Sequence, residues 1–173
     1  MKKQELGLGI SAVIPTRGDV DLKPIISNIE RFKEIKEIIV ADYDKSVYNR
    51  YIGCSKAKYD IIYTQDDDCI VDLQPLIDNY RKGVIVNAMK PEKMEEYTDM
   101  TLIGWGAIFD KSLIKVLDGW EQDELFLREC DRVFTALNKR HSIPMKIKDL
   151  YQGNRMSEES RHWDDLKKIR ARI

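Results

Sequence analysis

The sequence has few cysteines, and their spacing shows no paired pattern. The chain contains three, Cys54, Cys69 and Cys130, and no two of them form a Cys-x-x-Cys motif. A small, odd and scattered set favours reduced thiols in a cytosol-like compartment over a disulfide framework. We therefore expect a cytoplasmic protein.

Long apolar runs and a strong net charge are also missing. The opening residues, MKKQELGLGI, are too short and too interrupted for a signal peptide. No segment approaches the roughly 20 apolar residues that a membrane span needs. The 29 basic and 30 acidic residues give a net charge of -1, so no overall field favours nucleic acid or an anionic membrane. At 173 residues, the length predicts a single domain over residues 1–173.

Short apolar segments alternate with helical patterns in the first half of the chain. The segments ISAVIP, EIIVADYD, DIIYT and VIVNAM have the composition of buried strands. The residues between them repeat with helical spacing, and the first such helix would begin near Asp21 and extend toward Ile35. This alternation predicts an α/β fold with a mostly parallel central sheet flanked by helices.

The second half of the chain is less regular. Residues 101–109, TLIGWGAIF, predict a strand with a glycine-flanked Trp105. Residues 123–138 have the apolar spacing of an amphipathic helix. The charged residues 151–173 predict a C-terminal lid followed by a helix.

Three consecutive carboxylates, Asp66, Asp67 and Asp68, follow the third predicted strand. Adjacent like charges repel, so either solvent or a cation must stabilise them. Asp66 and Asp68 can direct oxygens at one hard divalent ion such as Mg²⁺ or Mn²⁺, which commonly shares its ligands with phosphate. The polar residues 16–19 and 42–44 follow two other strands, and ligands bind at the carboxyl ends of parallel strands. These positions favour a metal–diphosphate site over a solvated acidic turn.

On these segments the sequence resembles small GT-A glycosyltransferases of the nucleotide-diphospho-sugar transferase superfamily, with an exostosin-like Asp-x-Asp region. The matching pieces are SAVIPTRGD, EIIVADYD, NRYIGCSKAKYDIIYTQDDD and GWGAIF. The resemblance implies a single GT-A, Rossmann-like domain. It also implies metal-dependent transfer of a sugar from a nucleotide-diphosphate sugar, with a UDP-sugar favoured. The acceptor hydroxyl would lie on a saccharide or on a modified DNA base.

The resemblance implies ligands for the metal and for the donor. Asp66 and Asp68 would hold Mn²⁺ or Mg²⁺, with His162 as a third ligand, and Asp67 would touch the ribose or the sugar. The remaining nucleotide contacts would come from Pro15, Thr16, Arg17, Asp42 or Asp44, Arg50 and Arg155. The floor on which donor sugar and acceptor meet would be formed by Gly104, Trp105 and Gly106.

If the reaction inverts configuration, the resemblance also implies a general base at the start of a helix near the acceptor. Asp123 and Glu124 occupy such a position, and a carboxylate that takes a hydroxyl proton is ordinary general-base chemistry. If the reaction retains configuration, the same acids would serve in positioning or charge stabilisation. The alternative is that both are first-turn acids favoured by the helix dipole. His162 has a similar alternative as an ordinary helix residue.

Two other functions fit the same fold. A nucleotidyltransferase acting on a sugar phosphate normally has a glycine-rich, basic loop after the first strand. The segment PTRGDVD has one glycine and one arginine, which argues against that reaction. The other is a non-catalytic module that binds a nucleotide sugar or, through the basic tail KKIRARI, a nucleic acid.

Overall fold

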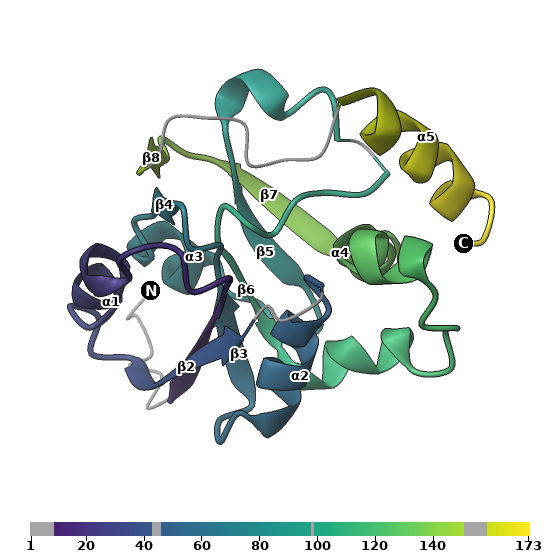
Figure 1. Ribbon diagram of the computed structural model, residues 1–173. Coiled ribbons are helices and arrows are strands. Elements are labelled where there is room, and N and C mark those ends of the chain that lie inside the picture. Colours follow the sequence, from purple (N-terminus) through teal and green to yellow (C-terminus); the bar gives the residue numbers. More distant parts are fainter. Residues whose placement is uncertain (1–8, 43–45, 98, 151–158) are drawn as a thin grey trace.

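The computed structural model describes residues 9–42, 46–97, 99–150 and 159–173, with backbone alone for residues 159–163. Its centre is a six-stranded sheet of order β2-β1-β3-β6-β5-β7 (Figure 1). The strands are β1 (Ile10–Thr16), β2 (Ile35–Asp42), β3 (Ile61–Thr64), β5 (Ile85–Met89), β6 (Ala107–Asp110) and β7 (Arg140–Pro144).

Five of the six strands run in the same direction, so their carboxyl ends lie along the same edge of the sheet. β1 pairs in parallel with β2 and β3, and β5 pairs in parallel with β7. β6 runs antiparallel to both β3 and β5. The carboxyl ends of the five parallel strands therefore meet the amino end of β6 along one edge, which we call the carboxyl edge. The mostly parallel sheet predicted from the sequence is confirmed.

Successive side chains along a strand point to opposite faces of the sheet, and they fill two apolar cores, one on each face. In β1, Val13 lies in one core while Ala12 and Ile14 lie in the other. All of β1 is buried, as expected for a strand covered on both faces. The Val13 face is covered by the helices α2 (Asn49–Lys56), α4 (Glu124–Leu137) and α5 (Glu159–Arg170) and the 3-10 segment η2 (Lys111–Leu117). The opposite face is covered by α1 (Lys23–Ile29) and α3 (Gln74–Asn79).

Several elements differ from the sequence prediction in extent. The first helix ends at Ile29, because Ile35 already belongs to β2 and pairs with Ile10. The strand predicted over residues 101–109 begins only at Ala107, because Gly106 has a φ of 102° and turns the chain just before it. The short pair β4 (Cys69–Ile70) and β8 (Lys148–Asp149), like β7, was not predicted.

α5 packs against α4 at the right of Figure 1. Leu166 and Ile169 of α5 are buried in the core on the Val13 face, and Asp165 accepts a hydrogen bond from Arg128 of α4 at 3.0 Å. The predicted C-terminal helix is therefore present, whereas residues 151–158 of the predicted lid lie outside the described residues. Within the described ranges, no helix is both long and apolar enough to cross a membrane.

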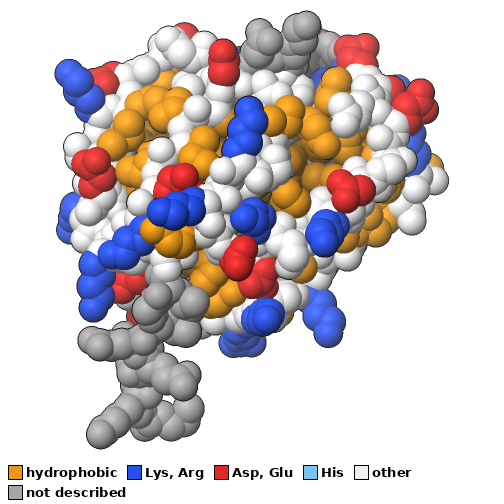
Figure 2. Space-filling model, turned by 90° about the horizontal axis from the view of Figure 1, so that it is seen from below, with side chains coloured by type: hydrophobic (Ala, Val, Ile, Leu, Met, Phe, Trp, Pro, Cys, Tyr) orange, Lys and Arg blue, Asp and Glu red, His pale blue; other side chains and the backbone are white. Residues whose placement is uncertain are grey.

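The surface seen from below carries mixed charge. Figure 2 shows lysine and arginine side chains interspersed with aspartate and glutamate, with apolar areas between them. This face therefore carries no broad field of one sign.

Candidate active site

The acidic cluster, which we define as Asp66, Asp67 and Asp68, lies at the carboxyl edge between β3 and β4. The Asp66 side chain is 43% exposed, and its backbone N–H donates to the carbonyl of Gly104 at 2.7 Å. Asp67 is buried, and the carbonyl of Asp68 accepts from the N–H of Leu150 at 2.8 Å. The fold thus separates the three neighbours into different surroundings and leaves Asp66 accessible.

A fully buried arginine lies behind the acidic cluster. Arg50 Nη2 is 2.5 Å from Asp66 Oδ1 and 3.4 Å from Asp131 Oδ2. Burial opposes the charge on Arg50, but Asp131 and Asp66 outweigh burial and hold the pKa of the guanidinium above its ordinary value. The family resemblance implies that Arg50 contacts the base edge or the diphosphate of the nucleotide. In the structure its guanidinium binds two carboxylates instead and has no exposed surface for a ligand.

Asp131 of α4 was missed by the sequence analysis. Its Oδ1 accepts a hydrogen bond from the Tyr51 hydroxyl at 2.7 Å, and its side chain is 18% exposed. Burial raises the pKa of Asp131, while Arg50 and the Tyr51 hydrogen bond oppose the increase without cancelling it. One sequence signal could have found this residue, since Asp131 is a charge beside the apolar positions of an amphipathic helix.

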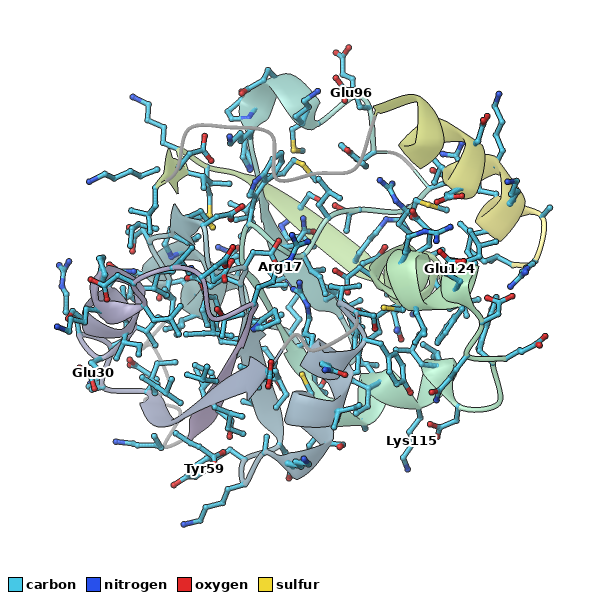
Figure 3. All side chains as sticks on the ribbon, in the orientation of Figure 1. Arg17, Glu30, Tyr59, Glu96, Lys115 and Glu124 are labelled. Carbon is cyan, nitrogen blue, oxygen red and sulfur yellow. The ribbon has the colours of Figure 1, made fainter. Side chains whose placement is uncertain are left out.

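Asp123 and Glu124, the predicted bases, make other contacts. Asp123 caps α4 by accepting from the Phe126 N–H at 2.8 Å, and it pairs with Arg172 at 2.7 Å. The hydrogen bond from Arg172 lowers the pKa of Asp123. Glu124 is exposed and pairs with Arg128 at 2.6 Å. Figure 3 shows Glu124 on α4 well apart from Arg17 at the carboxyl edge.

The end of β1 is tied directly to the acidic cluster. Thr16 Oγ1 donates to Asp67 Oδ2 at 2.7 Å and accepts from the Gly18 N–H at 3.0 Å. Pro15 is buried opposite Ala41 of β2, and Arg17 is exposed (Figure 3). The fold therefore brings together Thr16 and Asp67, two residues that the sequence assigned to the nucleotide.

The end of β2 lies at the same edge. Asp42 is exposed, and its carbonyl accepts from the Asn49 side chain at 2.5 Å, which ties β2 to the start of α2. Asp44 lies outside the described residues. Asp42 is thus the described member of the predicted Asp42–Asp44 pair.

The segment Gly104-Trp105-Gly106 lies against the acidic cluster. A Cβ on Gly104 would lie 2.1 Å from Asp66 Oδ2, so only glycine leaves room for that carboxylate. Gly106 has a φ of 102°, a conformation that favours glycine. Trp105 between them is partly buried, and Lys90 Nζ lies 4.9 Å from the centre of its ring.

Lys90 and Asp149 are two further polar residues beside the acidic cluster that the sequence analysis missed. Lys90 follows β5 at the carboxyl edge and pairs with Asp149 of β8 at 2.7 Å. Asp149 lies opposite Cys69 in the β4–β8 pair. Burial raises the pKa of the Cys69 thiol, Asp66, Asp68 and Asp149 raise it further, and Lys90 lowers it. The buried Cys69 thiol is therefore influenced by all four of these charged groups.

The acidic cluster has the donor atoms that a hard divalent ion requires. Arg50 binds one oxygen of Asp66, and the side chain is still exposed to a ligand. In the part of the chain that is described, no three His, Cys, Asp or Glu side chains gather as a metal site. Mg²⁺ often takes one or two protein carboxylates and completes its shell with phosphate oxygens and water, so the accessible carboxylate of Asp66 suits such an ion. Arg155 and the side chain of His162 lie outside the described residues.

Two solved structures share the fold over nearly the whole chain. Mannosyl-3-phosphoglycerate synthase from Rubrobacter xylanophilus has a TM-score of 0.58 at 17% identity, covering 98% of this chain and 75% of that chain. Glucosyl-3-phosphoglycerate synthase from Mycobacterium tuberculosis, solved with Mn²⁺, UDP-glucose and phosphoglyceric acid, has a TM-score of 0.55 at 13% identity, covering 95% and 78%. The chain has a GT-A fold.

The GT-A fold is the one that the sequence resemblance implied, so that prediction is confirmed. A second structure of the mycobacterial synthase, with Mn²⁺, UDP and phosphoglyceric acid, aligns at 14% identity with a TM-score of 0.49. That alignment covers 64% of this chain and only 58% of the other. No protein-family model and no curated protein matches the sequence. At such low identity the likeness establishes the GT-A fold, and activity and substrates are matters for a proposal.

Proposed function

We propose that the protein is a metal-dependent glycosyltransferase. It moves a sugar from a nucleotide-diphosphate sugar, with a UDP-sugar favoured, to an acceptor hydroxyl on a saccharide or a modified DNA base. The observation that carries the proposal is the accessible carboxylate of Asp66, beside Asp68, at the carboxyl edge of a GT-A sheet. The mycobacterial synthase of the same fold was solved with Mn²⁺ and UDP-glucose, which supports this choice of ligands.

In this proposal Asp66 and Asp68 hold Mn²⁺ or Mg²⁺, with His162 as the third ligand and Arg155 at the diphosphate. When bound, the ion neutralises the diphosphate and stabilises the departing nucleoside diphosphate as a Lewis acid. Arg50 would orient the metal ligand Asp66, because its guanidinium binds one oxygen of that carboxylate and leaves the other for the ion.

The end of β1 and the segment before β6 position the donor. The hydrogen bond from Thr16 holds Asp67 where it can meet the ribose or the sugar. The nucleoside lies between residues that follow β1 and β2, namely Pro15, Thr16, Arg17, Asp42 and Asp44. The sugar and the acceptor meet over Gly104, Trp105 and Gly106.

Asp131 is the general base that the geometry favours. Tyr51 and Arg50 fix the orientation of its carboxylate, and its raised pKa makes it a better proton acceptor than an ordinary aspartate. Through Arg50 it is also joined to Asp66, where the donor diphosphate binds in this proposal. Its carboxylate would take the proton of the acceptor hydroxyl. Asp123 and Glu124 are the alternative bases, and matched variants separate the two assignments.

The basic tail is a weaker candidate for the acceptor site. Arg170 pairs with Asp99 at 2.8 Å, and Arg172 pairs with Asp123 at 2.7 Å. Two of its basic side chains are thus engaged within the molecule. DNA bound at the tail would therefore compete with these two ion pairs, and a modified base in a duplex would first have to be flipped out.

Ligand-induced stabilisation tests the proposed function. UDP, GDP, CDP and their sugars are screened for a rise in melting temperature, with and without Mn²⁺, since a ligand that binds only the native state stabilises it. We expect a Mn²⁺-dependent shift with a UDP-sugar that is lost in Asp66→Asn and Asp68→Asn. Asp60→Asn is the matched control, because Asp60 is an exposed aspartate at the opposite end of β3.

Other results of this screen favour other functions. A shift that requires a nucleoside triphosphate and a sugar phosphate would favour a nucleotidyltransferase. No shift with any nucleotide or nucleotide sugar would favour a non-catalytic module that binds a nucleic acid. If the melting temperature rises equally in Asp66→Asn and in the wild type, the acidic cluster is not part of the nucleotide-binding site.

A further inference from the structure

Lys90, Trp105 and Asp149 form a three-residue group at the carboxyl edge. The function proposed above assigns a role to Trp105, over which the sugar and the acceptor meet, but none to Lys90 or Asp149. The Lys90 ammonium is held between the Asp149 carboxylate, 2.7 Å away, and the face of the Trp105 ring, 4.9 Å from its centre. The three residues come from the end of β5, the segment before β6, and β8. A cation fixed by two partners from distant segments is a preorganised binding element.

The group keeps hydrogen-bonding capacity for a ligand. An ammonium has three donors, and among the described residues Asp149 is the acceptor that Lys90 binds. Asp149 uses Oδ2 for this bond, and its side chain is 56% exposed. The Lys90 side chain is 22% exposed, and Trp105 is partly exposed. Donor, acceptor and aromatic surface are therefore available together.

The group flanks both carboxylates that are proposed to hold the metal. Trp105 follows Gly104, whose carbonyl binds the N–H of Asp66 at 2.7 Å. Asp149 precedes Leu150, whose N–H binds the carbonyl of Asp68 at 2.8 Å. A donor sugar is bonded directly to the diphosphate, so it must lie close to the ion. These two backbone hydrogen bonds place residues 105 and 149 next to the segment that carries Asp66 and Asp68, where such a sugar would lie.

We propose that Lys90, Asp149 and Trp105 form the subsite that recognises the hydroxyls of the donor sugar. The inference rests on the proposed glycosyltransferase function. A hexose presents hydroxyls that both donate and accept, which match the Lys90 ammonium and the Asp149 carboxylate. Its C–H face is apolar and matches the ring of Trp105, since aromatic side chains offer apolar area with little entropy to lose.

The chemistry of the group makes it a determinant of sugar identity. A site that hydrogen-bonds a substrate hydroxyl discriminates against an analogue that lacks it or places it elsewhere, because the polar groups that the bound sugar covers are then left unpaired. The nucleotide and the metal are bound by other residues. Changes at Lys90 or Asp149 should therefore alter the choice among sugars while the affinity for UDP stays the same.

Calorimetric titration in Mn²⁺ tests this inference on the full chain. The ligands are UDP and three UDP-sugars, namely UDP-glucose, its C4 epimer UDP-galactose, and UDP-N-acetylglucosamine, which carries an acetamido group at C2. The wild type should prefer one UDP-sugar over the other two. In Lys90→Met and Asp149→Asn that preference should shrink roughly tenfold, the value of about one good hydrogen bond, while the affinity for UDP changes by less than about twofold. Lys93→Met, which breaks the exposed pair with Glu96, is the matched control and should behave as the wild type.

Each contrary result has a distinct meaning. If Lys90→Met and Asp149→Asn keep the wild-type preference among sugars, the subsite is overturned. If they lose UDP and the sugars equally, the group supports the metal site and the inference is again overturned. If the wild type binds no UDP in the presence of Mn²⁺, the proposed glycosyltransferase function itself is contradicted. Trp105→Phe keeps an aromatic ring at this position. It should therefore retain most of the wild-type preference among the sugars.

Discussion

Arg50 Nη2 lies 2.5 Å from Asp66 Oδ1, so a fully buried cation on α2 supports an exposed carboxylate at the end of β3. The same nitrogen lies 3.4 Å from Asp131 on α4. The repulsion among the three adjacent aspartates is therefore reduced within the protein before any metal binds. Arg50 also links the carboxylate proposed for the metal to the carboxylate proposed as the base.

Replacing Arg50 by methionine should destabilise the fold strongly. The change leaves the largely buried Asp131 carboxylate without its cation, and breaking a buried ion pair from one side costs up to about 3–5 kcal/mol. Urea denaturation followed by circular dichroism measures the loss. Arg50→Met combined with Asp131→Asn should recover part of it, because the unpaired carboxylate is then gone. Equal stability of Arg50→Met and the wild type would show that the pair contributes little.

Gly104→Ala should disturb Asp66. The new Cβ would lie 2.1 Å from Asp66 Oδ2, so the carboxylate or the chain at Gly104 must move. We expect weaker Mn²⁺–UDP stabilisation and a lower melting temperature. A double-mutant cycle isolates the cause, because Gly104→Ala should cost little in an Asp66→Ala background, where no carboxylate stands in the way. An equal cost in both backgrounds would place the strain elsewhere.

Asp131→Asn should lower turnover by roughly 100-fold or more, since general-base catalysis contributes that order of rate. The amide keeps the shape of the side chain but cannot take the acceptor proton. Initial rates of UDP release with a competent acceptor measure the effect. Asp123→Asn and Glu124→Gln should keep turnover within about threefold of the wild type, as expected when the base lies elsewhere. Loss of turnover in either of these two, with Asp131→Asn active, would assign the base to the start of α4.

Glu129 should make stability depend on pH. It pairs with Arg132 at 2.7 Å within α4, and both side chains are buried. Burial raises the pKa of Glu129 from 4.5 to about 7, although Arg132 opposes the shift. The native state therefore holds this proton between pH 4.5 and about 7, where the unfolded chain releases it. This contribution to the free energy of unfolding is complete below pH 4.5 and is lost as the pH rises through about 7.

Denaturation of the wild type and of Glu129→Gln/Arg132→Met across this range measures the contribution. The double variant removes both charges, so no buried ion is left unpaired. The fall in stability between the two pH values should be smaller in the double variant. Parallel curves would show that Glu129 titrates at its ordinary value in the native state.

The sequence by itself determined the fold class and the position of the acidic cluster. The apolar runs of β1 and β3 mark buried strands because both of their faces are covered, and the residues that follow such strands must lie at one edge of a parallel sheet. The spacing of α4 likewise follows from one apolar helix face. These features depend on near neighbours along the chain, so a local pattern is enough to predict them.

Only the tertiary structure decided which charges meet. Tyr51 and Asp131 are 80 residues apart, and Lys90, which follows β5, is 59 residues from Asp149 of β8, yet each pair is in direct contact. No periodicity of the chain records such pairings. Packing of α2 against α4 and pairing of β8 with β4 place these side chains together, because the cores on the two faces of the sheet fix the helices and loops that carry them.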